Sequence, residues 1–113
     1  MFYGLNSLFI AYEYLDMDLT KIIHNNKYSY DEGITKGLML QFLKGLAKLH
    51  ENQVLHRDIK PENFLLYKED DPSHIKLIDF GLAKRVNPNE IMNKPNGTPY
   101  YIAPEVLKGS YTT

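Results

Sequence analysis

The stretch His56-Arg57-Asp58-Ile59-Lys60-Pro61-Glu62-Asn63 decides how this chain is interpreted. It lies between two short β-rich runs, residues 53–55 and 64–67. A third run, 75–78, ends in Asp79-Phe80-Gly81, and a polar loop joins it to the second run. Short β-rich runs separated by a polar loop are typical of a hairpin. The sequence therefore places charged side chains at the joints of a small β hairpin.

Upstream of this stretch the sequence predicts a strand and two helices. Apolar residues recur at three- and four-residue steps over 31–51, which indicates one buried helix face; they are Ile34, Leu38, Phe42, Leu46 and Leu49. Ser29 and Glu32 have the spacing of a capping box, which predicts where this helix starts. A shorter helix is predicted over 19–23, and the apolar run 8–12 predicts a buried strand.

The composition is that of an ordinary soluble protein. The chain has 113 residues with 13 basic and 14 acidic side chains, a net charge of −1. This balance argues against nucleic acid or an anionic membrane surface as the main partner. The absence of cysteine excludes disulfides, thiolate metal sites and a cysteine nucleophile. The longest apolar run is too short to span a bilayer, and the composition fits an intracellular, cytoplasmic location.

A third string completes a recognisable set. It is Gly97-Thr98-Pro99-Tyr100-Tyr101-Ile102-Ala103-Pro104-Glu105. Together with the stretch 56–63 and Asp79-Phe80-Gly81, it resembles the catalytic loop, the metal-binding turn and the Ala-Pro-Glu segment of eukaryotic protein kinases. The resemblance implies an α+β, partial protein-kinase-like fold: the end of the N-lobe, the hinge and the first part of the helical C-lobe, with the catalytic loop and activation segment.

The resemblance covers all 113 residues but only the middle of a kinase domain. The family's glycine-rich loop, the lysine of its third strand and its later C-lobe helices have no counterpart in this sequence. We therefore expect residues 1–113 to be an internal fragment of a catalytic domain, inactive when isolated.

The resemblance assigns the chemistry of phosphoryl transfer to four residues. Asp58 matches the base that orients the substrate hydroxyl and accepts its proton, and Lys60 matches the cation that neutralises the γ-phosphate of ATP. Asn63 and Asp79 match the two Mg²⁺ ligands, and Mg²⁺ prefers such oxygen ligands together with phosphate oxygens. Gly81 is expected to let the backbone turn sharply behind Asp79.

Part of the nucleotide site is expected in the connector that follows the first strand. When residues 8–15 are matched to the family's hinge, Tyr12 takes the gatekeeper position. The same match places the Glu13 carbonyl and the Leu15 amide opposite the adenine edge.

Four further positions are interpreted through the same resemblance. Asp16 or Asp18 is expected to accept hydrogen bonds from ribose hydroxyls, and Leu65 is expected to pack beneath adenine. Arg57 matches an anchor for a phosphate or an acid of the activation segment. His56 matches a structural histidine of the core and not a base.

The substrate class follows from two positions of the resemblance. Lys60 and the string 97–101 resemble serine/threonine kinases, whereas tyrosine kinases have a different insert after the catalytic aspartate. The string 97–107 is similar to calcium/calmodulin-regulated and calcium-dependent kinases, while Asp18-Leu19 looks like cyclin-dependent kinases.

The resemblance thus implies transfer of the γ-phosphate of ATP to Ser/Thr hydroxyls of protein substrates, with Mg²⁺ as cofactor. It is compatible with a calcium-sensing regulatory domain outside this chain. The alternative is a pseudokinase scaffold that binds partners without transferring phosphate.

Residues 83–96 lack periodicity and predict a long functional loop. Many kinases are activated by phosphorylation between the Asp-Phe-Gly turn and the Thr-Pro string. Here residues 82–96 contain no Ser, Thr or Tyr, and Glu90 is their only acid. We expect that Glu90, or nothing, occupies the pocket of Arg57, so that the loop needs no phosphate to become ordered. The alternative is that Glu90 is simply solvated.

Overall fold

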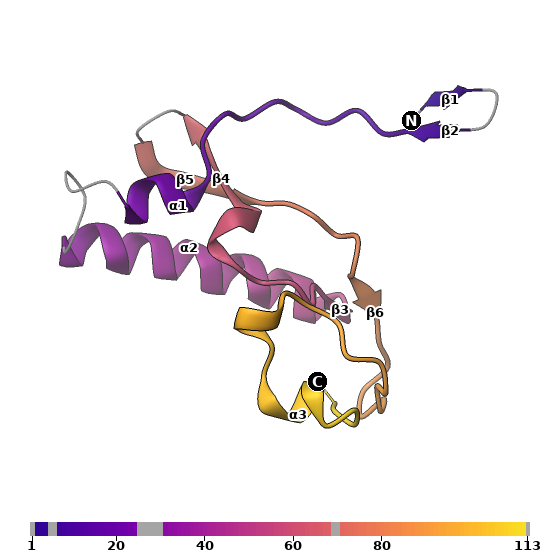
Figure 1. Ribbon diagram of the computed structural model, residues 1–113. Helices are drawn as coiled ribbons and strands as arrows, with labels where there is room; N and C mark the ends of the chain where they lie inside the picture. Colours follow the sequence, from indigo (N-terminus) through magenta and orange to yellow (C-terminus); the bar gives the residue numbers. More distant parts are fainter. Residues whose placement is uncertain (1, 5–6, 25–30, 69–70, 113) are drawn as a thin grey trace.

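The computed structural model describes residues 2–4, 7–24, 31–68 and 71–112 (Figure 1). In chain order the elements are β1 (Phe2–Gly4), β2 (Ser7–Phe9), α1 (Leu19–Ile23), α2 (Glu32–Glu51), β3 (Val54–Leu55), η1 (Pro61–Asn63), β4 (Phe64–Lys68), β5 (Asp71–Leu77), β6 (Lys84–Arg85), η2 (Pro99–Tyr101) and α3 (Pro104–Leu107). The described strands pair into three antiparallel two-stranded sheets, β1–β2, β3–β6 and β4–β5. The expected α+β class is confirmed.

Helix α2 begins at Glu32 because Asp31 caps it. The Asp31 Oδ1 atom accepts a hydrogen bond from the Ile34 backbone N–H at 2.9 Å, which satisfies a donor that the first helical turn leaves free. The predicted capping box is therefore wrong, because Glu32 is the first helical residue and not the third. Ser29, its other member, lies outside the described residues.

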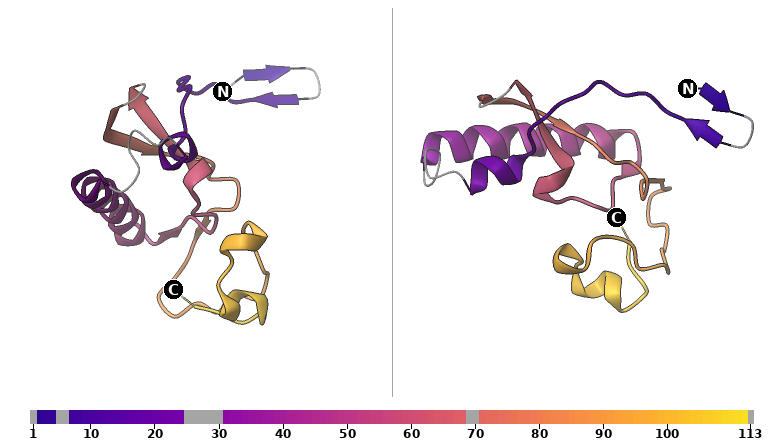
Figure 2. Two further views of the ribbon diagram at one scale, coloured as in Figure 1. Left: turned by 60° about the vertical axis from the view of Figure 1, so that its left-hand side comes forward. Right: turned by 45° about the horizontal axis from the view of Figure 1, so that its top comes forward.

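The predicted apolar face of α2 is confirmed. Its five residues are the half-buried apolar positions of the helix, whereas Met39, Leu40 and Leu43 are exposed. The face packs against β5 and β3, and Figures 1 and 2 show the helix running along one side of the β4–β5 hairpin. The Phe42 ring meets the Phe64 ring edge-on at 5.5 Å, a favourable aromatic arrangement. Helix α2 therefore supports the β4–β5 hairpin by packing against one side of it.

A single α2 side chain makes two hydrogen bonds to the backbone of β5. The Gln41 Oε1 atom accepts from the Ile75 backbone N–H at 2.9 Å, and its Nε2 atom donates to the Pro72 carbonyl at 3.1 Å. Strand β5 begins at Asp71, earlier than the predicted residue 75. Proline is tolerated at such an edge because an edge strand need not donate to a further neighbour.

The β4–β5 hairpin contributes two of the five buried apolar side chains of the described residues. Phe64 pairs with Leu77 and Leu66 pairs with Ile75, and Phe64 and Leu66 are both buried. Between them Leu65 points to the other face, as the twofold period of a strand requires. At the edge of β4 that faces away from β5, the Leu66 backbone N–H donates to the Met17 carbonyl at 2.8 Å. This contact attaches the start of α1 to the hairpin.

Two predictions about strands are corrected. The strand expected at 8–12 is only β2, Ser7–Phe9, and it is not buried, since Leu8 and Phe9 are 52% and 59% exposed. Its partner among the described residues is β1, and a two-stranded ribbon has no second layer to cover it. Strand β6 was not predicted; it forms because β3 pairs with it, Val54 opposite Arg85 and Leu55 opposite Lys84.

The described part of the chain holds no helix that combines the length and the apolar character needed to cross a membrane. Figure 2 shows that residues 92–112 lie on the opposite side of the loop 56–63 from the β1–β2 hairpin. The loop 56–63 therefore lies between these two parts of the described structure.

We predict that the 113-residue chain exposes apolar surface in solution. Fifteen large apolar or aromatic side chains are exposed among the described residues, and contiguous exposed apolar surface promotes association and dye binding. The chain should bind a hydrophobic dye and melt over a broad temperature range. Replacing Leu40 and Leu43 together by Lys should reduce dye fluorescence without loss of helical circular dichroism. A sharp cooperative melt with no dye binding would contradict the prediction.

Candidate active site

The catalytic loop, residues 56–63, is anchored by His56. This side chain is buried, its Nε2 atom donates to the Ile78 carbonyl at 2.9 Å, and its Nδ1 atom accepts from the Asp58 backbone N–H at 3.2 Å. The two contacts fix one tautomer, and the ring also meets Phe80 edge-on at 5.0 Å. With both ring nitrogens occupied, His56 connects the loop to the strand end before Asp79. Its role is structural, as predicted.

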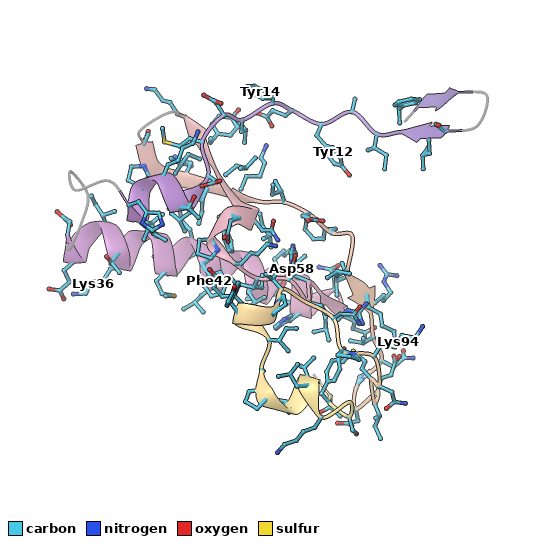
Figure 3. All side chains as sticks on the ribbon, viewed as in Figure 1. Tyr12, Tyr14, Lys36, Phe42, Asp58 and Lys94 are labelled. Carbon is cyan, nitrogen blue, oxygen red and sulfur yellow. The ribbon has the colours of Figure 1, made fainter. Side chains whose placement is uncertain are left out.

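Asp58 lies at the centre of a connected polar cluster. Its side chain is 8% exposed, and Thr98 Oγ1 donates to its Oδ1 atom at 2.6 Å. Lys60 Nζ lies 3.3 Å from Oδ2 and also donates to Thr98 Oγ1 at 2.7 Å. Asn63 Nδ2 donates to the Asp58 carbonyl at 2.8 Å and to Oδ2 at 3.3 Å. Figure 3 shows Asp58 where the catalytic loop meets the segment leading to η2.

The cluster keeps Asp58 ionised. Burial alone would raise the pKa of Asp58, but hydrogen bonds from Thr98, Lys60 and Asn63 outweigh burial and hold the pKa below its ordinary value. Ionised Asp58 therefore stabilises the folded state. This contribution is fully present above the pKa of an unfolded aspartate and is lost as the pH falls through the lowered pKa of the folded state. At neutral pH the site presents a fixed, buried carboxylate.

Asn63 and Asp79 flank the open end of the β4–β5 hairpin, Asn63 directly before β4 and Asp79 two residues after β5. The Ile78 backbone N–H donates to the Asn63 carbonyl at 2.9 Å, so the residue after Ile78 lies beside the catalytic loop. Asn63 is buried and Asp79 is exposed. Because the Asn63 amide nitrogen faces Asp58, its amide oxygen is turned to the other side. One amide oxygen and one carboxylate therefore lie at this end of the hairpin.

These two residues fit a magnesium site completed by phosphate. Within the described residues no three His, Cys, Asp or Glu side chains form a group able to hold a metal ion. Mg²⁺ does not need such a cage, because it is commonly bound through one or two protein oxygens, water and substrate phosphates. The donor set of Asn63 and Asp79 matches this preference.

The sharp turn at 79–81 is made differently from the prediction. The residue in the left-handed region is Asp79, with φ of 63°, and not Gly81. A Cβ atom on Gly81 would lie 3.1 Å from Asp79 Oδ1, and the Gly81 N–H donates to that oxygen at 3.2 Å. The glycine therefore serves to leave space beside the carboxylate.

The expected nucleotide-contacting residues are only partly brought together. Asp18 forms an isolated bridge with Leu65, so a ribose candidate and the adenine-floor candidate are neighbours. The Asp18 Oδ1 atom also caps α1, accepting from the Thr20 N–H at 2.9 Å. Asp16 Oδ1 accepts from the Tyr14 hydroxyl at 2.9 Å. Both ribose candidates thus already hold hydrogen bonds in this structure.

The hinge candidates lie on an extended, exposed segment. Tyr12, expected at the gatekeeper position, is 83% exposed, as is Tyr14, and Figure 3 shows both on the stretch that leads from β2 to α1. The Glu13 carboxylate pairs with Lys76 of β5. Leu15 is half-buried on the same segment.

Thr98 was not among the site residues predicted from the sequence. It contacts Asp58, and both residues line a pocket of about 220 Å³. Gly97 lets the backbone before Thr98 lie close to Arg57. The φ angle of Gly97 is 125°, and a Cβ atom on this residue would lie 3.2 Å from the Arg57 carbonyl oxygen. The string Gly97-Thr98-Pro99 was noticed in the sequence. Local sequence cannot show that the Thr98 hydroxyl contacts Asp58, because the two residues are 40 positions apart.

Comparison with known proteins agrees with this geometry. The family model of the protein kinase domain matches residues 1–113. The chain belongs to the protein kinase domain family. It is 46% identical over 101 residues to a CDPK-related protein kinase of Daucus carota, covering 89% of this chain and 16% of the relative.

Two further relatives support the serine/threonine and calcium-dependent kinase resemblance. CDPK-related kinase 5 of Arabidopsis thaliana is 49% identical over 84 residues, 74% of this chain and 14% of the relative. A probable serine/threonine-protein kinase 2 of Plasmodium falciparum is 48% identical over 90 residues, 79% of this chain and 18% of the relative. The chain therefore spans between 14% and 18% of the length of these three relatives.

Within this kinase domain, Glu90 does not occupy the pocket of Arg57. The Arg57 Nε atom donates to the Leu82 carbonyl at 2.6 Å, whereas Glu90 forms an ion pair with Lys84. Glu90 Oε2 also accepts from the Asn87 backbone N–H at 2.9 Å. The expectation that Glu90 occupies the Arg57 pocket is therefore wrong; its side chain is 29% exposed and pairs with Lys84 of β6, a strand that the sequence did not predict.

We predict that Thr98→Val raises the pKa of Asp58. Of the contacts that lower this pKa, the Thr98 hydrogen bond is the largest, and valine removes it with little change in shape. In the full-length protein the acid limb of the pH profile of peptide phosphorylation should move to higher pH, and kcat/KM should fall roughly 10- to 100-fold.

Thr98→Ser is the matched control, because serine retains the hydroxyl. It should keep both the pH profile and the Asp58 titration, followed by ¹³C NMR of the carboxyl carbon, close to the wild type. An unchanged Asp58 titration in the valine variant would show that Thr98 does not hold this carboxylate.

Proposed function

We propose that the full-length protein is an ATP-dependent serine/threonine protein kinase, which transfers the γ-phosphate of ATP to Ser/Thr hydroxyls of protein substrates. The observation that carries the proposal is the buried, ionised Asp58 held by Thr98, Lys60 and Asn63. Phosphoryl transfer depends mainly on positioning and on neutralisation of anionic oxygens. The relatives named as serine/threonine and CDPK-related kinases support it.

Asp58 would orient the acceptor hydroxyl and receive its proton. As the bond from the hydroxyl oxygen to the γ-phosphorus forms, the bond from that phosphorus to the β–γ bridging oxygen breaks and ADP leaves. A carboxylate with a lowered pKa is a weak base, so its main contribution is orientation, with proton acceptance late in the step. Thr98 restrains the carboxylate, and Lys60 supplies positive charge beside it.

Asn63 and Asp79 would hold Mg²⁺, which neutralises charge on the phosphates when bound. For the nucleotide we propose contacts from the Glu13 carbonyl, the Leu15 amide and the side chains of Asp18 and Leu65. The Asp18–Leu65 bridge supports this assignment, because it places a ribose-binding candidate next to the adenine-floor candidate.

The proposal also extends to the protein as a whole. Residues 1–113 would form an internal part of a catalytic domain, in agreement with the small share of each relative that they match. We propose an intracellular, cytoplasmic location and, from the CDPK-related names of the relatives, a calcium-sensing regulatory domain elsewhere in the protein. None of the described contacts favours a scaffold without phosphate transfer, and the four residues required for transfer are all present.

We predict that Asp58→Asn in the full-length protein lowers kcat for a peptide substrate by roughly 100-fold or more, because orientation and proton acceptance act in the transition state. Affinity for Mg-ATP should stay close to the wild type. Asp31→Asn is the matched control, since asparagine also caps a helix and Asp31 lies at the start of α2. Near-wild-type phosphorylation by the Asp58 variant would contradict the assignment, and Mg-ATP binding by an inactive wild type would favour the scaffold.

We predict a different defect for Asp79→Asn. Loss of a carboxylate ligand should weaken Mg-ATP binding at least about tenfold, as loss of a contact at a metal site does. The affinity should be measured by calorimetry at several Mg²⁺ concentrations. The defect should shrink as Mg²⁺ is raised; a defect that does not respond to Mg²⁺ would place Asp79 outside the metal site.

A further inference from the structure

The chain turns back after α3 and pairs with the segment that precedes the Thr-Pro string (Figure 1). Gly109 follows the helix with a φ of 77°, a left-handed conformation that suits glycine and commonly ends helices. Two residues later Tyr111 exchanges two backbone hydrogen bonds with Met92, at 2.8 and 3.1 Å. Met92 is 3% exposed, so the pairing attaches Tyr111 to a buried anchor of this segment.

The Tyr111 side chain contacts the backbone a little further along the same segment. Its hydroxyl donates to the Lys94 carbonyl at 2.8 Å, and the Asn96 Nδ2 atom donates to the same oxygen at 2.9 Å. A carbonyl oxygen has two lone pairs, so the two donors use both of them. Tyr111 and Asn96 are half-buried and both line the pocket beside Asp58. The Lys94 carbonyl is therefore the point at which the returning chain restrains the segment.

The restrained backbone leads directly to the candidate site. Asn96 and Gly97 precede Thr98, whose hydroxyl donates to Asp58 Oδ1 at 2.6 Å. Glycine has the widest backbone freedom of any residue, so contacts on either side of Gly97 are needed to hold Thr98 in place. On its N-terminal side these contacts include the two hydrogen bonds to the Lys94 carbonyl. Figure 3 labels Lys94 and Asp58, which this short stretch connects.

We propose that Tyr111 is a positioning residue of the kinase site, which keeps Thr98 in contact with Asp58. The inference rests on the proposed kinase function and adds a residue to that site. The effect on the reaction is indirect. The Tyr111 hydroxyl restrains the Lys94 carbonyl, the restrained backbone places Thr98, and Thr98 restrains the carboxylate that orients the acceptor hydroxyl.

The first test is Tyr111→Phe in the full-length protein, because phenylalanine keeps the ring and the backbone pairing and removes only the hydroxyl. The kcat for a peptide substrate should fall about two- to tenfold, the range for loss of one hydrogen bond. The KM for ATP should stay within about twofold of the wild type. Tyr67→Phe is the matched control, since it removes a hydroxyl from an exposed tyrosine of β4 and keeps its ring over Lys76. An unchanged kcat in the Tyr111 variant would overturn the proposal.

A double-mutant cycle separates positioning from a general loss of stability. In a Thr98→Val background the hydroxyl that Tyr111 positions is absent, so adding Tyr111→Phe should lower kcat by less than about twofold. Asn96→Leu keeps the size of the side chain and removes the other donor to the Lys94 carbonyl, so it should reproduce the Tyr111→Phe defect. Additive effects of Tyr111→Phe and Thr98→Val, or a wild-type kcat in the Asn96 variant, would contradict the proposed route.

Hydrogen exchange supplies a readout that does not need activity. The Tyr101 backbone N–H donates to the Thr98 carbonyl at 2.9 Å, so its exchange reports on the turn that carries Thr98. This amide should exchange faster in the Tyr111→Phe variant, while the amides of α2 keep their protection. If the wild type phosphorylates no peptide but the exchange result holds, the proposed function fails and the restraint by Tyr111 stands. Unchanged exchange at Tyr101 would overturn the inference even if kcat falls.

Discussion

A buried negative charge at Asp58 is the constraint on which the rest of the structure depends. An ionised carboxylate removed from water is costly unless it is paired and hydrogen-bonded. Here the compensating groups come from its own loop, through Lys60 and Asn63, and from a segment 40 residues later, through Thr98. These two parts of the chain must therefore be assembled before Asp58 can be buried.

The surrounding backbone is arranged to meet this requirement. Arg57 and Asp79 both adopt left-handed φ angles, 66° and 63°, which non-glycine residues rarely do. Such conformations persist when neighbouring contacts over-determine them, and they concentrate at functional sites. His56 and Ile78, which immediately precede these two residues, are joined by the hydrogen bond from His56 Nε2 to the Ile78 carbonyl, so the two loops are connected. The two strained backbone positions, Arg57 and Asp79, therefore lie in the loops that carry the candidate site residues.

The local elements follow from short-range rules. The periodicity over 31–51 predicted α2 and its half-buried face, and the β-rich runs predicted β3, β4 and the later part of β5. Helix α1 has the predicted bounds 19–23. These features depend on residues within a few positions of one another, which a sequence displays directly. The chemical candidates Asp58, Lys60, Asn63 and Asp79 were likewise visible as a motif, although their mutual geometry was not.

What the sequence alone determined is the family, the main helix, the hairpin and the identity of the charged residues at its joints. The tertiary structure decided which of these groups meet: Thr98 with Asp58, Glu90 with Lys84 and not Arg57, and Gln41 with the edge of β5. It also decided that β6 exists and that residues 8–10 are exposed. The physical reason is the same in each case. A contact between residues far apart in the chain depends on which surfaces the folded backbone brings together, and burial depends on what covers a strand.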